Sequence, residues 1–177
     1  IVTRLTGGVG ALLRKAGVKV LKGWAQIEDG KTAIVQVDGE AVRVRCEHLL
    51  LATGSEPVEL PSMPFGGPGG PIWSSTDALS PDILPKRLVV VGAGYIGLEM
   101  AEAFVRRGAR VTLVDSGAVP MRSLDPDMSA RVATAVRRFG IELRTGTEVQ
   151  GFEPGAVHTS QGTIAADLVV LGLGVVP

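Results

Sequence analysis

The order of apolar and polar residues predicts a helix followed by strands in the first part of the chain. Apolar residues recur at helical spacing from Ile1 to Ala16, although three glycines weaken this helix, because each costs about 1 kcal/mol relative to alanine. The residues that follow predict a β-meander with strands at Val18 to Ile27, Lys31 to Val37 and Ala41 to Cys46. The continuously apolar run His48 to Gly54, HLLLATG, predicts a central strand that stops at a glycine.

The second part follows a connection rich in proline and glycine, from Glu56 to Pro71. A short helical turn is expected within Trp73 to Leu84, where Ser75-Thr76-Asp77 is a capping signal. Strands and helices then alternate, as is typical of a parallel sheet. The expected elements are a strand at Leu88 to Val91, a helix through Arg107, a strand at Arg110 to Val114, a helix from Asp125 to Gly140, a strand at Ile141 to Arg144, and a closing meander over Glu148 to Glu153, Ala156 to Ser160 and Thr163 to Leu173.

This succession predicts an α/β fold. A strand that returns after a crossover helix lies beside the earlier strands in a parallel sheet. We therefore expect a Rossmann-like parallel sheet with a three-stranded antiparallel meander, preceded by the helix and β-meander of the first part.

Three glycines stand at the turn between the first strand and helix of this sheet. Gly92, Gly94 and Gly97 form the pattern G-x-G-x-x-G. The first glycine allows the tight turn, the second lets a pyrophosphate approach the backbone, and the third lets the helix pack close to the strand. The helix N-terminus would then face a phosphate, so the pattern predicts a dinucleotide site, with a purely structural turn as the alternative.

An acidic residue follows at the spacing that a ribose requires. Asp115 ends the second strand, 18 positions beyond Gly97, and a carboxylate near this distance accepts hydrogen bonds from adenosine ribose hydroxyls. It would also repel a 2′-phosphate. The sequence therefore predicts NAD rather than NADP as the ligand, although Arg122 in the following loop weakens that choice.

Composition narrows the classes of function. With 18 basic and 18 acidic residues, the chain offers no reason to expect nucleic acid or a basic membrane contact. No apolar run approaches the roughly 20 residues of a membrane helix, and no signal peptide is visible. The single cysteine, Cys46, allows no internal disulfide and favours a small buried side chain over a reactive thiol. We expect a cytoplasmic protein without a metal site.

Several segments together resemble the pyridine nucleotide-disulfide oxidoreductases, and within them the dihydrolipoamide dehydrogenase branch. They are LTGGVGALLRKAGVKVLKGWAQI at Leu5 to Ile27, HLLLATGSEP at His48 to Pro57, SSTDAL at Ser74 to Leu79, GAGYIGLEMAEAFVRRGARVTLVDS at Gly92 to Ser116, and ADLVVLGLGVVP at Ala166 to Pro177. The glycine fingerprint is shared by many proteins, whereas LTGG followed by a meander and ATGS is far more selective. In such enzymes electrons pass from a dithiol to a redox disulfide, then to FAD, and finally as hydride to NAD.

The resemblance implies roles for individual residues. Thr53 and Gly54 would lie near FAD, and Tyr95 would cover the flavin face until nicotinamide displaces it. Glu99 would lie near the nicotinamide carboxamide. The full set implied for NAD is Gly92, Gly94, Tyr95, Ile96, Gly97, Glu99, Asp115, Gly172 and Gly174. Packing on a neighbour is the alternative for Tyr95, and a solvated helix charge is the alternative for Glu99.

The chain also departs from the family pattern. The N-terminal FAD fingerprint, the C-x-x-x-x-C redox pair and the C-terminal catalytic histidine and glutamate are absent, and His48 and His158 match nothing catalytic. We therefore expect a central fragment, with residues 1–73 as the last part of a FAD domain and residues 74–177 as the NAD-binding domain.

The resulting hypothesis is an NAD(H)-binding segment that has no catalytic residues of its own and is inactive alone. Its partners would be NAD(H) and either further copies of itself or the remainder of a flavoenzyme, with FAD not retained by this chain. The alternatives are a folding or assembly module without useful nucleotide affinity, and the same segment of an NADH oxidase or a mercuric reductase.

Overall fold

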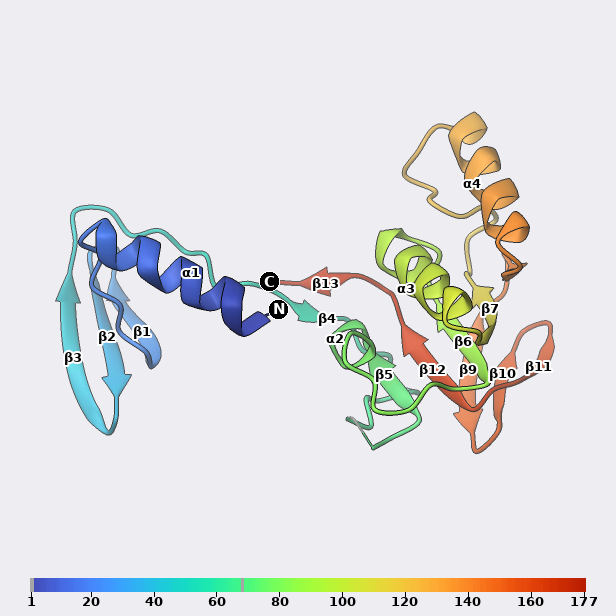
Figure 1. Ribbon diagram of the computed structural model, residues 1–177, viewed down its shortest axis with the longest axis horizontal. Coiled ribbons are helices and arrows are strands. Elements are labelled where there is room, and N and C mark those ends of the chain that lie inside the picture. The colour runs from blue at the N-terminus through green and yellow to red at the C-terminus, as the bar shows by residue number, and fades with distance from the viewer. Residues whose placement is uncertain (1, 68) are drawn as a thin grey trace. The chain divides into compact units, whose positions relative to one another are not determined.

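The computed structural model describes residues 2–67 and 69–177, which form two compact units. The first unit ends at Ala52 and the second begins at Thr53, and each is described by itself (Figure 1). The predicted division of the chain into a FAD-domain part and an NAD-domain part at residues 73 and 74 stays a prediction. No helix among the described residues has the length and apolarity that a membrane span requires.

The first unit contains the predicted helix and the predicted meander. Helix α1 (Val2–Lys15) confirms the helix, while Ile1 lies outside the described residues. The antiparallel sheet follows in the order β1-β2-β3, with strands β1 (Trp24–Asp29), β2 (Thr32–Val37) and β3 (Glu40–Arg45). The first strand begins at Trp24, so the predicted start at Val18 was too early.

The strand predicted over His48 to Gly54 is wrong. These residues have no strand structure, and 88 % of Leu50 is exposed. An apolar run becomes a strand only where neighbouring strands supply hydrogen bonds and other elements cover its faces. Among the described residues nothing pairs with this run, so its apolar side chains lie in solvent.

The second unit is built on a five-stranded parallel sheet in the order β5-β12-β6-β7-β8. This confirms the α/β fold predicted from the alternation of strands and helices. The strands are β5 (Ile72–Ser74), β6 (Arg87–Val91), β7 (Arg110–Val114), β8 (Glu142–Arg144) and β12 (Leu168–Leu171). Strand β12 lies between β5 and β6 in this sheet, although the sequence placed its residues at the end of the meander.

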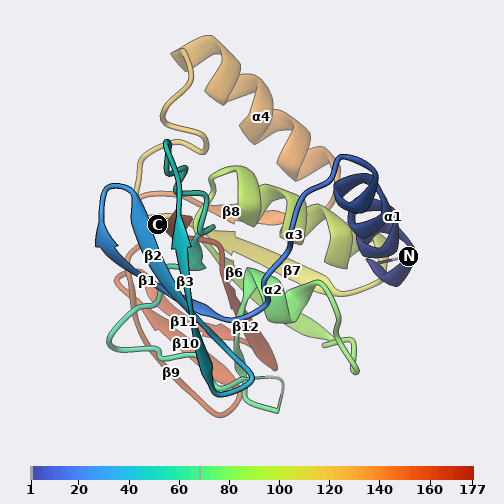
Figure 2. The ribbon, with the colours of Figure 1, turned by 90° about the vertical axis from the view of Figure 1, so that its left-hand side faces the viewer.

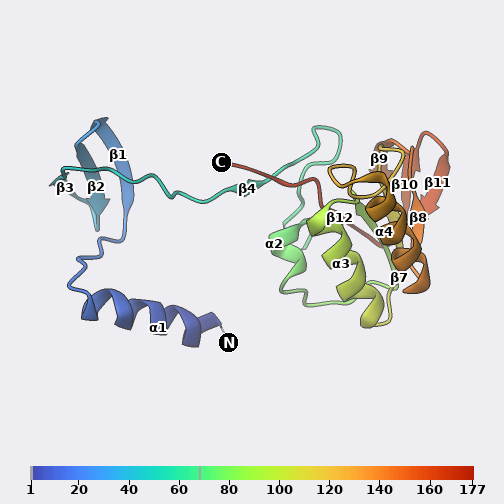
Figure 3. The same ribbon diagram turned by 90° about the horizontal axis from the view of Figure 1, so that it is seen from above.

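Both faces of this sheet are covered, as the alternation along β6 shows. Leu88 and Val90 pack into an apolar cluster with residues of the helices α3 (Tyr95–Arg106) and α4 (Pro126–Arg138). Val89 and Val91 point to the other face, into a cluster with residues of the antiparallel meander β9 (Val149–Glu153), β10 (Ala156–Thr159) and β11 (Gly162–Ala165). In Figure 3, α2 and α3 lie on the left of this unit and the meander strands β10 and β11 lie on its right.

Helix ends follow local sequence signals. The short helix α2 (Ser75–Ala78) starts after Ser74, whose hydroxyl accepts a hydrogen bond from the Asp77 backbone N–H while the Asp77 carboxylate accepts from the Ser74 N–H. The N-cap is therefore Ser74, one residue before the predicted capping signal Ser75-Thr76-Asp77. Asp125 is the N-cap of α4 as predicted, with Pro126 as its first residue. Figure 2 shows α2, α3 and α4 from a second side.

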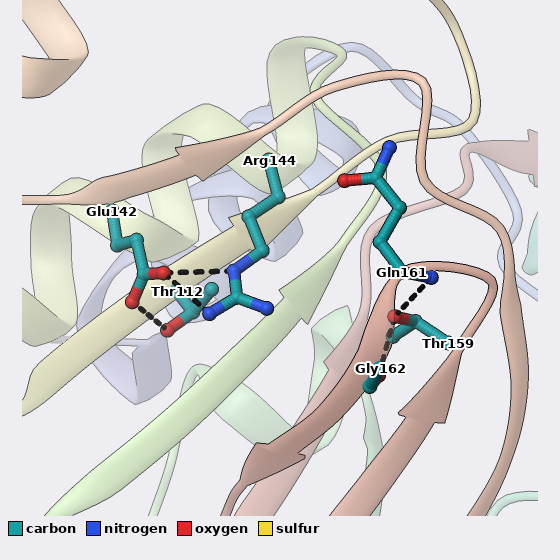
Figure 4. A network of polar contacts seen from close by, with 6 residues as sticks. All are labelled: Thr112, Glu142, Arg144, Thr159, Gln161 and Gly162. Atoms are coloured by element: carbon teal, nitrogen blue, oxygen red, sulfur yellow. Dashed lines mark hydrogen bonds and ion pairs between the residues drawn. The ribbon is translucent and has the colours of Figure 1, made fainter.

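Side-chain hydrogen bonds are present at one edge of the parallel sheet and at one turn of the meander (Figure 4). Glu142 on the edge strand β8 accepts a hydrogen bond from the Thr112 hydroxyl at 3.2 Å and another from Arg144 Nε at 2.7 Å. At the turn between β10 and β11, the Thr159 hydroxyl donates to the Gly162 carbonyl at 2.6 Å. These contacts satisfy polar groups at positions where the strand ladders end.

An ion pair joins β6 to the start of β12. The Arg87 side chain donates from Nε to Asp167 Oδ1 at 3.0 Å, and the Arg87 backbone N–H donates to Oδ2 at 2.9 Å. The hydrogen bonds from Arg87 hold the pKa of the Asp167 carboxyl below its usual value. A short two-stranded pair, β4 (Glu56–Pro57) with β13 (Val175–Val176), completes the second unit.

Candidate nucleotide-binding site

Two glycines of the fingerprint, Gly92 and Gly97, pack against Gly172 at the carboxyl end of β6. Gly92 has a φ of +101°, which a side chain would strain, and a Cβ on Gly97 would lie 1.7 Å from the Gly92 carbonyl oxygen. A Cβ on Gly172 would lie 2.7 Å from the Gly97 Cα. The backbones of Gly92, Gly97 and Gly172 are therefore packed against one another, and only glycine fits at these positions.

Gly94 has a different environment, because a Cβ built on it would meet no atom within 4 Å. It is the N-cap of α3, and its backbone is extended, with φ −85° and ψ −170°. No internal contact requires glycine here. The open space lies at the start of a 12-residue helix, where free N–H groups and the helix dipole favour an anion.

A cavity of about 620 Å³ opens beside this turn. Its volume lies within the range of about 300 to 1,000 Å³ that is usual for small-molecule and cofactor sites. The turn after β6, the ends of β7 and β12, and the start of β9 all contribute to its wall. The lining residues are Leu60, Val91, Gly92, Ala93, Gly94, Tyr95, Ile96, Asp115, Ser116, Val119, Met121, Arg122, Ser123, Thr147, Glu148, Val149, Gly172, Leu173 and Gly174.

Asp115 lies on the wall of this cavity and also holds the backbone around it. Its Oδ2 accepts a hydrogen bond from the Ala93 N–H at 2.6 Å, and its Oδ1 accepts from the Gly117 N–H at 2.6 Å. Because a carboxylate offers about four acceptor positions, two remain for a ligand hydroxyl. Asp115 can therefore fix the glycine turn and bind a ribose at the same time.

The other sequence-predicted residues fall into two groups. Tyr95, Ile96 and Gly174 line the cavity with the glycines, and 66 % of Tyr95 is exposed at the start of α3. Gly97 is buried beneath the turn and does not line the cavity. Glu99 is exposed on α3 and is absent from the lining residues.

Residues with other predicted roles lie elsewhere. Thr53 and Gly54 are exposed and do not line the cavity, so their contact with FAD stays a prediction. Cys46 is a partly buried free thiol whose Sγ donates to the Lys31 carbonyl at 3.4 Å. His158 Nε2 lies 3.2 Å from Glu153 Oε1 on the meander. Within residues 2–67 and 69–177, no group of three or more acidic, histidine or cysteine side chains is arranged for a metal ion.

Several residues of the cavity wall were not predicted from the sequence. Thr147, Glu148 and Val149 reach it from the segment that leads into β9, and Arg122 and Ser123 reach it from the loop after β7. Of these residues the sequence singled out only Arg122, as a basic residue a few positions after the acidic one. The others are placed by the fold of loops whose sequences have no periodic pattern.

A protein-family model and several known proteins match most or all of the chain. A model of the family described as pyridine nucleotide-disulphide oxidoreductase matches residues 1–177. A dihydrolipoyl dehydrogenase of Pseudomonas aeruginosa is 47 % identical over 180 residues, which cover 98 % of this chain and 38 % of that protein. A dihydrolipoyl dehydrogenase of Haloferax volcanii is 36 % identical over 155 residues, covering 86 % of this chain and 32 % of that protein. The chain thus spans less than two fifths of the length of these relatives.

Solved structures have the same fold. The HOCl-induced flavoprotein disulfide reductase RclA of Escherichia coli, as the Cu(II) complex of a mutant, superposes with a TM-score of 0.77 at 24 % identity, covering 90 % of this chain and 37 % of that one. An engineered water-forming NADPH oxidase bound to NADPH superposes with a TM-score of 0.74 at 25 % identity, covering 94 % of this chain and 40 % of that one.

Proposed function

The chain belongs to the pyridine nucleotide-disulphide oxidoreductase family, and we propose that it is the NAD(H)-binding segment of a flavoenzyme similar to dihydrolipoyl dehydrogenase. The observation that carries this proposal is the combination of an open Gly94 backbone with the Asp115 carboxylate on the wall of one cavity. The first suits a pyrophosphate and the second suits a ribose.

Each part of the cavity has a proposed role. The pyrophosphate would lie over Gly94, within reach of the free N–H groups at the start of α3. The adenosine ribose would donate hydrogen bonds to Asp115. Tyr95 would contact the nicotinamide half, because it stands exposed at the start of the helix. Glu99 would approach the same half from the next turn.

The chemistry of the whole flavoenzyme is a further part of the proposal. There, FAD and NAD would exchange a hydride after electrons arrive from a dithiol, and Thr53 and Gly54 would approach the flavin. The sequence has one cysteine and therefore cannot form the redox disulfide within this chain. We expect no lipoamide turnover by this chain alone. An NADH oxidase or a mercuric reductase is the alternative parent enzyme, and we expect no turnover by this chain alone in that case either.

The choice of NAD over NADP rests on Asp115. The engineered oxidase that binds NADPH carries five substitutions, which remove an aspartate 18 positions after a substituted glycine and introduce arginines one and seven positions after that aspartate. Gly97, Asp115 and Arg122 have the same spacing in this chain. Loss of an aspartate in an NADPH-binding variant supports a role for Asp115 in disfavouring the 2′-phosphate.

Calorimetric titration of the chain with NADH tests the proposal. We expect saturable binding to one site, weakened at least tenfold in Asp115→Ala, because that change removes a ribose acceptor and the support of the glycine turn. No heat of binding at millimolar NADH would contradict the proposal. Undiminished binding by Asp115→Ala would contradict the role of the carboxylate.

A second candidate function is that of an assembly module without useful nucleotide affinity. It is favoured by the exposed apolar side chains of the first unit, which include Leu5 and Leu12 on α1, Trp24 on β1, and Leu50. Exposed apolar surface of this kind favours self-association. Light scattering at several concentrations separates the candidates, since a monomeric chain that binds NADH would exclude the assembly role.

A further inference from the structure

The loop between β7 and α4, residues 116–124, forms part of the cavity wall. The residues that it contributes to the lining are Ser116, Val119, Met121, Arg122 and Ser123. Its start is fixed, because the Gly117 carbonyl accepts a hydrogen bond from the Gly146 N–H at 2.7 Å. Within the described part of the chain, Met121 is the only residue from 118 to 123 that forms hydrogen bonds outside the loop. The position of this part of the wall therefore depends on Met121.

Met121 has a backbone conformation that is unusual for a residue with a side chain. Its φ of +50° lies in the left-handed region that favours glycine, and its side chain is buried. The Met121 N–H donates to the Ala93 carbonyl at 2.9 Å, and the Met121 carbonyl accepts from the Leu124 N–H at 2.8 Å. Strained conformations of this kind persist where the surrounding structure enforces them. The loop would therefore leave this conformation if its contacts were removed.

Ser129 on α4 supplies a further contact to this residue. Its side chain is 1 % exposed, and its hydroxyl donates to the Met121 carbonyl at 3.1 Å. A serine or threonine inside a helix usually donates to a carbonyl one turn earlier in the same helix. Thr134 of α4 does so, since its hydroxyl donates to the Ala130 carbonyl at 3.0 Å. The Ser129 hydroxyl instead bonds outside its helix, and it thereby connects α4 to the cavity wall.

A continuous series of hydrogen bonds thus runs from α4 to the glycine turn. Ser129 donates to Met121, and Met121 donates to the Ala93 carbonyl. Ala93 lies inside the fingerprint, and its N–H donates to Asp115 Oδ2 at 2.6 Å. The loop and the carboxylate proposed to bind the ribose are therefore held by the same residue of the turn. A shift of Met121 would move the wall next to the adenosine half of the nucleotide.

We propose that Ser129 is a positioning residue for nucleotide binding, which holds Met121 and with it the loop that receives the adenosine half. This inference rests on the proposed nucleotide-binding function. Ser129 does not line the cavity, so it acts through Met121 and not by touching the ligand. Without the hydroxyl, only a fraction of the molecules would have the wall in place. The apparent affinity then falls by that fraction.

The test compares the unmodified chain with three variants. Ser129→Ala removes the hydroxyl, and Ser129→Cys keeps the size of the side chain with a weak S–H donor. Thr134→Ala is the matched control, because it removes a hydroxyl of the same helix that bonds only within that helix. NADH affinity is measured by nucleotide fluorescence, and AMP affinity by competition with NADH, since AMP has the adenosine half alone. Thermal unfolding followed by circular dichroism checks folding, and ¹⁵N relaxation measures the mobility of residues 118–123.

We expect Ser129→Ala to weaken the binding of NADH and of AMP by the same factor, about fivefold, because one neutral hydrogen bond is lost. The backbone of residues 118–123 should become more mobile in this variant. Ser129→Cys should show a smaller loss of affinity in the same direction. Thr134→Ala should match the unmodified chain in affinity and in loop mobility.

Unchanged NADH affinity in folded Ser129→Ala would overturn this inference and leave Ser129 a structural role only. Weakened NADH binding with unchanged AMP binding would also overturn it, because the effect would not lie at the adenosine half. If Ser129→Ala does not fold, Ser129→Cys decides by the same outcomes. If the unmodified chain binds no NADH, the proposed function fails and this inference falls with it. The failures of the two proposals are therefore distinguishable.

Discussion

Two alanine substitutions in the fingerprint should have opposite effects on stability and on nucleotide binding. At Gly97 a Cβ would lie 1.7 Å from the Gly92 carbonyl oxygen and 2.9 Å from its carbon. Both neighbours are backbone atoms of the tight turn, so they cannot move as a flexible side chain would. At Gly94 a Cβ would meet nothing within 4 Å of the protein.

The structure sets the size of each effect. Overfilling a packed site costs about 1 to 3 kcal/mol, and the overlap with backbone puts Gly97→Ala at the upper end or above it. About 3 kcal/mol corresponds to a fall of roughly 10 °C in the melting temperature of a domain of this size. Gly94 has an extended backbone that alanine adopts, so Gly94→Ala should change the free energy of unfolding by less than about 0.5 kcal/mol.

Nucleotide binding should show the reverse contrast. The added methyl group of Gly94→Ala would occupy the space through which a pyrophosphate approaches the backbone, so we expect at least a tenfold loss of NADH affinity, about 1.4 kcal/mol. The assays are thermal unfolding followed by circular dichroism and NADH fluorescence titration. Unchanged NADH binding by a folded Gly94→Ala variant would refute the placement of the phosphate. Unchanged stability of Gly97→Ala would refute the packing of the turn.

Three further substitutions test other contacts. Asp115→Ala should lower the free energy of unfolding by about 2 kcal/mol, measured by urea denaturation, because the Ala93 and Gly117 N–H groups lose their charged acceptor; equal stability would contradict this. Ser74→Ala should lower stability by about 1 kcal/mol through loss of the helix cap and leave NADH binding unchanged. Asp167→Asn should be slightly less stable than the unmodified chain at pH 7. The difference should begin to shrink near the unfolded carboxyl pKa of about 3.9 and disappear as the pH falls through the lowered pKa of the folded state, where Asp167 becomes protonated. A pH-independent difference in urea denaturation would contradict the last expectation.

Much of the second unit could be predicted from its sequence. The continuous apolar strands β6 and β7 require cover on both faces, and the glycine turn between them allows one local geometry. The acidic residue after β7 then falls beside that turn, because neighbouring parallel strands end at the same edge. In this β6–turn–β7 region, the structure that the local sequence favours is also the one that the surrounding sheet requires.

The sequence-based predictions failed where the local structure depends on residues that are distant in the sequence. The apolar run at His48 to Gly54 has the composition of a buried strand, but no described segment pairs with it. Strand β5 was missed because its three residues are too few to show a period. Met121 has a positive φ of +50°, which hydrogen bonds to Ala93 and Ser129 maintain. Nothing in the sequence of the loop predicted this backbone conformation.

Residue-by-residue mapping of NADH binding by changes in backbone amide NMR shifts tests the proposed site most directly. We expect the largest changes on residues 92–97, 115–123 and 172–174, with saturation that fits a single site. Changes confined to the first unit, or none at millimolar NADH, would contradict the claim that this cavity binds the nucleotide.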